Sequence, residues 1–89
     1  MYYWIANSDD GAYEMDSIRD LGKQFETKRE AYDDMRDAAL EKMKWNTEFD
    51  EDYADETEII EYNVHFEFSQ NKITHESYSG LYTYEIKEK

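Results

Sequence analysis

The sequence predicts an α+β fold, a single small domain over residues 1–89 with its elements in the order β-α-β-β-β. Three observations predict this fold. A long amphipathic helical pattern begins at Thr27, strict alternation of apolar and polar residues runs through 60–68, and turn signals follow at 70–71 and 79–80. We therefore expect about four strands in a mostly antiparallel sheet, with one main helix packed on one face.

The composition indicates a folded chain in a reducing compartment. The chain has no Cys, which excludes a disulfide framework, thiol catalysis and Cys-type zinc sites. Two Trp, nine Tyr and four Phe supply large apolar areas for a core despite the high charge. No apolar run approaches the ~20 residues of a membrane span, and the N-terminus lacks the basic start of a signal peptide. We expect a cytoplasmic protein that binds no membrane.

The first part of the chain predicts one strand and then leaves two alternatives. Residues 2–6 are aromatic and β-branched, which is typical of a strand, and turn-forming residues end it at 7–11. Within residues 12–26, Gly22 is placed to close a short helix. Apolar residues recur there at helical spacing: Ile18, Leu21 and Phe25. The alternative is a second short strand at residues 12–15.

The main helix is predicted to start at Thr27. Thr27 and Glu30 form a T-x-x-E capping box, in which each side chain accepts an N–H of the other residue. The apolar stripe, with Trp45 at its edge, consists of Ala31, Tyr32, Met35, Ala38, Ala39 and Met43. The opposite side is acidic and carries Glu30, Asp33, Asp34, Asp37 and Glu41.

The second half of the chain predicts a three-stranded meander. The alternation over residues 60–68 puts Ile60, Tyr62, Val64, Phe66 and Phe68 on one face. The two turns then place on the same face Ile73, His75, Ser77, Tyr82, Tyr84 and Ile86. In this register His65 is opposite Glu76, and His75 is expected to be a hydrogen-bonded core histidine. The place of the first strand, beside the second or the last, stays open.

The negative charge is concentrated in one segment. The chain has a net charge of −13, and residues 45–71 hold nine acids and no Lys or Arg. The segments 27–44 and 72–89 are each neutral. Such a local excess repels nucleic acid and anionic membranes, and it attracts basic protein surfaces, including those that hold nucleic acid.

The acids of residues 48–58 have two interpretations, a solvated loop or an anionic docking surface. As a docking surface, the segment would use Glu48, Asp50, Glu51, Asp52, Asp55, Glu56 and Glu58, with Phe49 and Tyr53 as aromatic contacts or core anchors. The helix would assist with Asp33, Asp34, Asp37 and Glu41. Because carboxylates three or four residues apart on a helix lie ~5–6 Å apart, these acids could imitate a row of phosphates.

The sequence contains few features that are typical of an enzyme or of a metal site. The Ca²⁺-loop pattern is not met, since Asp50 and Asp52 are not followed by the Gly that it requires. His65, Glu61, Glu67 and Glu76 are more typical of a solvated cross-strand group than of a metal site. No phosphate loop and no nucleophile motif occurs. We expect no cofactor, no metal and no enzymatic activity.

In general character the chain resembles the small acidic proteins that phages and other mobile elements use against host defence, of which anti-CRISPR proteins are the largest group. The resemblance rests on size, the absence of Cys, one compact domain, and the carboxylates at Asp33, Asp34, Asp37, Glu41 and 48–58. It implies a stoichiometric inhibitor in the host bacterial cytoplasm. Such an inhibitor blocks the nucleic-acid-binding cleft of a Cas nuclease or Cascade-type complex as a nucleic-acid mimic, without binding nucleic acid itself.

Two other functions remain as alternatives. One is an acidic adaptor or antitoxin-type subunit that uses an exposed sheet edge or the outer face around Tyr78 and Leu81. The other is a small hydrolase or metal protein. For the inhibitor we expect a monomer or weak dimer, and we leave open the partner, the inhibited step and the stoichiometry.

Overall fold

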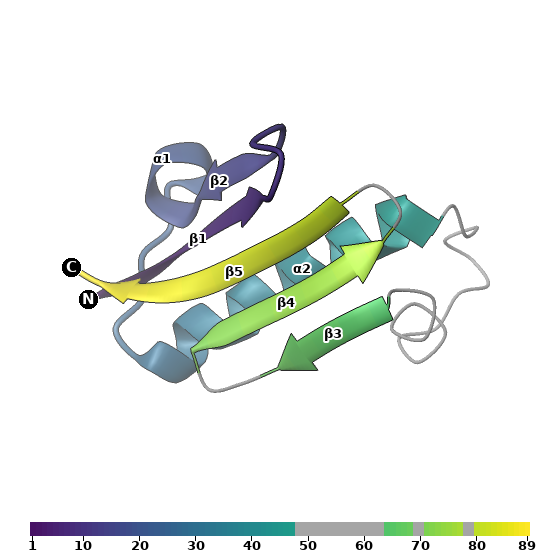
Figure 1. Cartoon of the computed structure of the whole chain (residues 1–89). Helices are drawn as coiled ribbons and strands as arrows, with labels where there is room; N and C mark the ends of the chain where they lie inside the picture. The colour runs from purple at the N-terminus through teal and green to yellow at the C-terminus, as the bar shows by residue number, and fades with distance from the viewer. Residues whose placement is uncertain (48–63, 69–70, 78–79) are drawn as a thin grey trace.

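The computed structural model of the chain describes residues 1–47, 64–68, 71–77 and 80–89 (Figure 1). Its elements are β1 (Tyr2–Ser8), β2 (Glu14–Asp16), α1 (Ser17–Leu21), α2 (Lys28–Thr47), β3 (Val64–Phe68), β4 (Lys72–Ser77) and β5 (Gly80–Glu88). Within these described ranges, no helix is long and apolar enough to cross a bilayer.

The predicted fold class is confirmed. The strands form one sheet in the order β2-β1-β5-β4-β3, with every neighbouring pair antiparallel, and α2 lies across one face (Figure 1). Within the described residues the sheet has five strands where about four were expected, because the three-residue β2 adds an edge strand. The open question about the first strand is answered by its register with the last, in which Trp4 is opposite Ile86. The two terminal strands thus lie at the centre of the sheet.

Both alternatives for residues 12–26 occur, one after the other. β2 pairs with β1, and α1 follows at once. Asp16 caps α1, since its carboxylate accepts the backbone N–H groups of Ile18 and Arg19 at 2.9 and 3.1 Å. Gly22 ends α1 with φ of 65°, a left-handed conformation that a residue without Cβ adopts readily.

The N-terminus of α2 differs in one detail from the predicted capping box. The Thr27 hydroxyl accepts the Glu30 backbone N–H at 3.1 Å, as expected. The Glu30 carboxylate, however, accepts the Thr27 hydroxyl at 3.0 Å in place of the Thr27 backbone N–H. One hydroxyl therefore makes both bonds at this helix start.

The core lies between α2 and the sheet face that the alternation predicts. The buried residues of β4 and β5 are those expected, namely Ile73, His75, Tyr82, Tyr84 and Ile86. They meet the stripe of α2, in which Ala31, Met35, Ala39 and Met43 are buried, together with Trp4 and Ala6 of β1. Tyr32 and Ala38 lie at the margin of the core, partly buried.

The β3–β4 register corrects one expectation. Val64, and not His65, is opposite Glu76, whereas Glu67 pairs with Thr74 further along. Three steps in β3 therefore match two in β4, which is the signature of an extra residue in a β-bulge. Residues 60–63 of the predicted strand lie outside the described part of the chain.

Candidate functional site

The outer face of α2 presents a row of acids. Between Ala31 and Lys44 the exposed residues are Asp33, Asp37 and Glu41, and all three are acidic. They follow one another at a spacing of four residues, which puts neighbours ~5–6 Å apart along one side of a helix. We call these three residues the acidic row.

Between Ala31 and Lys44 the bases of α2 are less exposed than three of its four acids. α2 contains five acids and five bases, so the helix as a whole is neutral. Arg36, Lys42 and Lys44 are nevertheless half-buried, and Arg36 and Lys44 have interaction partners. Lys42 turns toward the sheet, where its Nζ lies 4.5 Å from the centre of the Tyr13 ring. Between Ala31 and Lys44 the surface of α2 is therefore anionic, although the composition of the helix is balanced.

Asp34 has a structural role that the helical pattern did not indicate. Its Oδ2 accepts the indole Nε1–H of the buried Trp4 at 2.8 Å, and its Oδ1 lies 3.2 Å from the Lys23 ammonium. The Asp34 side chain is 22% exposed, and it joins α2 to β1 and to the segment after α1. Since both of its oxygens are already engaged, Asp34 contributes less to an external surface than Asp33, Asp37 and Glu41.

We expect Asp34→Ala to lower the free energy of unfolding by about 1–3 kcal/mol, because it leaves the buried Trp4 indole N–H without its acceptor. The matched exposed variant Asp33→Ala should change the free energy by less than about 0.5 kcal/mol. Urea unfolding followed by circular dichroism measures both. Equal stability of the two variants would contradict the role assigned to Asp34.

A stack of aromatic rings from β4 and β5 packs in the core on the side of the sheet that α2 covers. His75 is fully buried, with its ring centre 5.0 Å from that of Tyr82 and 5.5 Å from that of Tyr84. Its Nε2 lies 3.2 Å from the Tyr84 hydroxyl, which confirms the expected hydrogen-bonded core histidine. Burial, and next the positive charge of Lys42, lower the pKa of His75 to about 4. Burial likewise raises the pKa of Tyr84. These two pKa shifts keep His75 and Tyr84 neutral at pH 7.

The structure leaves most of the predicted docking residues untested. The predicted contacts that lie outside the described part of the chain are Glu48, Phe49, Asp50, Glu51, Asp52, Tyr53, Asp55, Glu56 and Glu58. The four helix acids are described: Asp33, Asp37 and Glu41 are exposed, and Asp34 is engaged internally. In residues 1–47, 71–77 and 80–89, no three His, Asp or Glu side chains are grouped as metal ligands.

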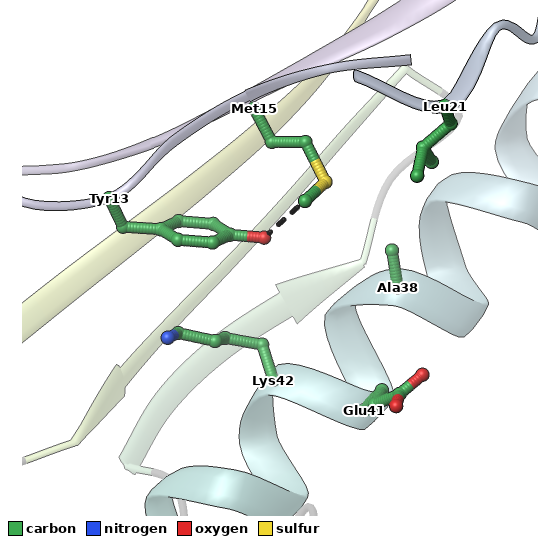
Figure 2. Close-up of a pocket in the computed structure, with 6 residues that line it drawn as sticks. All are labelled: Tyr13, Met15, Leu21, Ala38, Glu41 and Lys42. Atoms are coloured by element: carbon green, nitrogen blue, oxygen red, sulfur yellow. Dashed lines mark hydrogen bonds between the residues drawn. The ribbon is translucent and has the colours of Figure 1, made fainter.

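A groove beside the acidic row was not predicted from the sequence. It lies between α2 and the β2–α1 segment, has a volume of about 400 Å³, and is lined by Tyr13, Met15, Leu21, Ala38, Glu41 and Lys42 (Figure 2). The exposure of Leu21 (43%) at the end of α1 marks its rim. The sequence signal was weak, because the groove depends on where α1 lies relative to α2.

Comparisons with known proteins return no relative. No protein-family model matches the chain, and neither curated proteins nor solved structures include a significant match. Any function must therefore be inferred from the chemistry of the described surface.

Proposed function

We propose that this protein is a stoichiometric inhibitor that uses its acidic surface to occupy the nucleic-acid-binding cleft of a host defence protein, in the manner of anti-CRISPR proteins. The observation that carries the proposal is the exposure pattern of α2. Between Ala31 and Lys44 its exposed residues are three carboxylates in one row, while the nearby bases are half-buried. The acids of residues 48–58 stay a prediction from the sequence and would add to this surface.

The acidic row has the chemistry of a phosphate mimic. A cleft that binds nucleic acid draws much of its affinity from Lys and Arg contacts to phosphates. Carboxylates at ~5–6 Å intervals on a rigid helix offer such side chains similar partners. Two bases outside α2 are engaged within the chain, since Arg19 pairs with Glu14 and Asp20, and Lys23 pairs with Asp34.

The scaffold below the row favours binding without rearrangement. Met35 and Ala39 of α2 are fully buried on the opposite side of the helix, against the sheet. A rigid anionic row loses little conformational entropy when it binds, which raises affinity for a partner of fixed shape.

We expect the protein to abolish target-DNA binding by at least one member of a panel of purified Cas effectors, such as Cas nucleases and Cascade-type complexes. Fluorescence anisotropy of labelled target DNA measures this loss at a one-to-one ratio of inhibitor to effector. Direct binding of the protein to that effector, measured without DNA, should weaken steeply as salt rises from about 50 to 200 mM, because the contact is electrostatic. DNA binding unchanged across the panel, even at a large excess of the protein, would refute inhibition at this step.

The adaptor alternative predicts a different behaviour. Leu81, on the outer sheet side that this alternative uses, is 38% exposed. Substituting Leu81 by Ser should leave DNA displacement unchanged if the acidic row is the contact. A loss of partner binding in Leu81→Ser, with Asp37→Asn fully active, would favour the adaptor.

A further inference from the structure

The groove beside the acidic row has the features of an anchor site. Three of its walls are apolar, provided by Met15, Leu21 and Ala38, whose side chains point toward one common space (Figure 2). Its volume of about 400 Å³ exceeds that of one large side chain. Thioether side chains such as that of Met15 adapt to irregular partners. The Tyr13 hydroxyl donates to the Met15 sulfur at 3.8 Å, a long and weak hydrogen bond within the groove.

The charges around the groove indicate which charged groups of a partner would lie beside a side chain bound in it. Glu41 belongs both to the groove wall and to the acidic row, so the groove opens beside exposed negative charge. Lys42 also lines the groove, but it extends beneath the Tyr13 ring and away from Glu41 (Figure 2). Its ammonium also lies 5.4 Å from the Tyr82 ring centre, on the side of the core.

We propose that the groove binds one large apolar side chain of a basic protein segment, which is flanked by Arg or Lys that pair with Glu41 and Asp37. The inference rests on the proposed function and names the partner's local chemistry: a tryptophan or leucine between cations. A large aromatic side chain that fills a pocket near the centre of an interface is typical of the residues that dominate its affinity. The acidic row would attract any cationic surface, and the groove would select the partner that also carries the apolar side chain.

Three synthetic pentapeptides test this inference. The first carries tryptophan between two pairs of arginine, the second replaces the tryptophan by alanine, and the third replaces the arginines by glutamate. Methyl NMR of the intact protein reports on Met15 and Leu21. We expect the first peptide to shift both methyl signals in a saturable way and to bind about tenfold more tightly than the second. The third peptide should not bind.

Two leucine variants provide a matched pair. Leu21→Ser removes a groove wall that is 43% exposed, whereas Leu81→Ser removes a leucine that is 38% exposed and does not line the groove. We expect Leu21→Ser to weaken the tryptophan peptide about fivefold to tenfold, and Leu81→Ser to leave it unchanged. The comparison of the tryptophan and alanine peptides on the unmodified protein requires no variant, so a folding defect cannot decide the test.

The outcomes separate the two proposals. Equal affinity for the tryptophan and alanine peptides, or Met15 and Leu21 signals that do not move, would overturn the groove inference and leave the acidic row standing. An alanine peptide that binds equally well to wild type and to the triple variant Asp33→Asn, Asp37→Asn, Glu41→Gln would instead remove the support for the inhibitor. If the tryptophan peptide still moved the methyl signals in that case, the apolar groove would stand, but the pairing of flanking cations with Glu41 and Asp37 would be overturned.

Discussion

Trp4→Ala should remove a large share of the protein's free energy of unfolding. Trp4 is fully buried between α2 and the sheet, and its ring centre lies 6.3 Å from that of Tyr84. Truncation of a buried tryptophan typically costs about 3–5 kcal/mol, since it removes transfer free energy and leaves a cavity. A small domain has about 5–15 kcal/mol in total, and this chain starts with strong self-repulsion. Circular dichroism during urea unfolding measures the loss.

Trp4→Phe divides this effect into packing and hydrogen bonding. The phenyl ring keeps most of the apolar contact but loses the indole Nε1–H that Asp34 accepts at 2.8 Å. Its cost should be well below that of Trp4→Ala. A double-mutant cycle with Asp34→Ala isolates the coupling between the two residues, which we expect to be about 1 kcal/mol. Trp4→Ala as stable as wild type would contradict the assigned core.

The pH dependence of stability should carry a large contribution from His75. Its pKa in the folded state is about 4, against about 6.5 in the unfolded chain. Between these values the unfolded state binds the proton and the folded state does not. The contribution is therefore fully present above pH 6.5 and is lost as the pH falls toward 4. At pH 4.5 the loss from this one residue should be roughly 2–3 kcal/mol.

Comparison with His75→Phe separates this effect from the titration of the carboxylates. The phenyl ring retains the stack on Tyr82 and Tyr84 but cannot bind a proton. We expect the stability difference between wild type and variant to shift against wild type by roughly 2–3 kcal/mol from pH 7 to pH 4.5. Urea unfolding at several pH values measures it. Parallel pH profiles for the two proteins would show that His75 is not buried in its neutral form.

The regular spacing of apolar residues determined how much of the fold could be predicted from the sequence. Alternation over β4 and β5 identified the buried Ile73 and Tyr84 correctly, because the strand period is two and one face is covered. The stripe of α2 was equally clear, and so was the exposure of Asp37 on the other side. These features depend on residues that are close together in the sequence, so a single sequence is enough to predict them.

Features that depend on distant neighbours were not predictable. Asp34 falls among the outer acids by helical period, yet its partner Trp4 precedes it by thirty residues. The pairing of β1 with β5 joins the two ends of the chain, and no local signal specifies it. The Lys42 contact and the groove likewise depend on where β2 and α1 lie against α2. The acidic row was thus anticipated as part of a larger helical set, and the structure identifies which members face outward.

The most direct test displaces labelled target DNA from an effector that the protein inhibits. Wild type is titrated in parallel with the triple variant Asp33→Asn, Asp37→Asn, Glu41→Gln. A control with the same change in net charge carries Glu26→Gln, Glu76→Gln and Glu88→Gln, which lie outside the row. We predict that half-displacement requires at least about tenfold more of the row variant and an unchanged amount of the control. Displacement by the row variant at the wild-type concentration would contradict the claim that these three carboxylates take the place of phosphates.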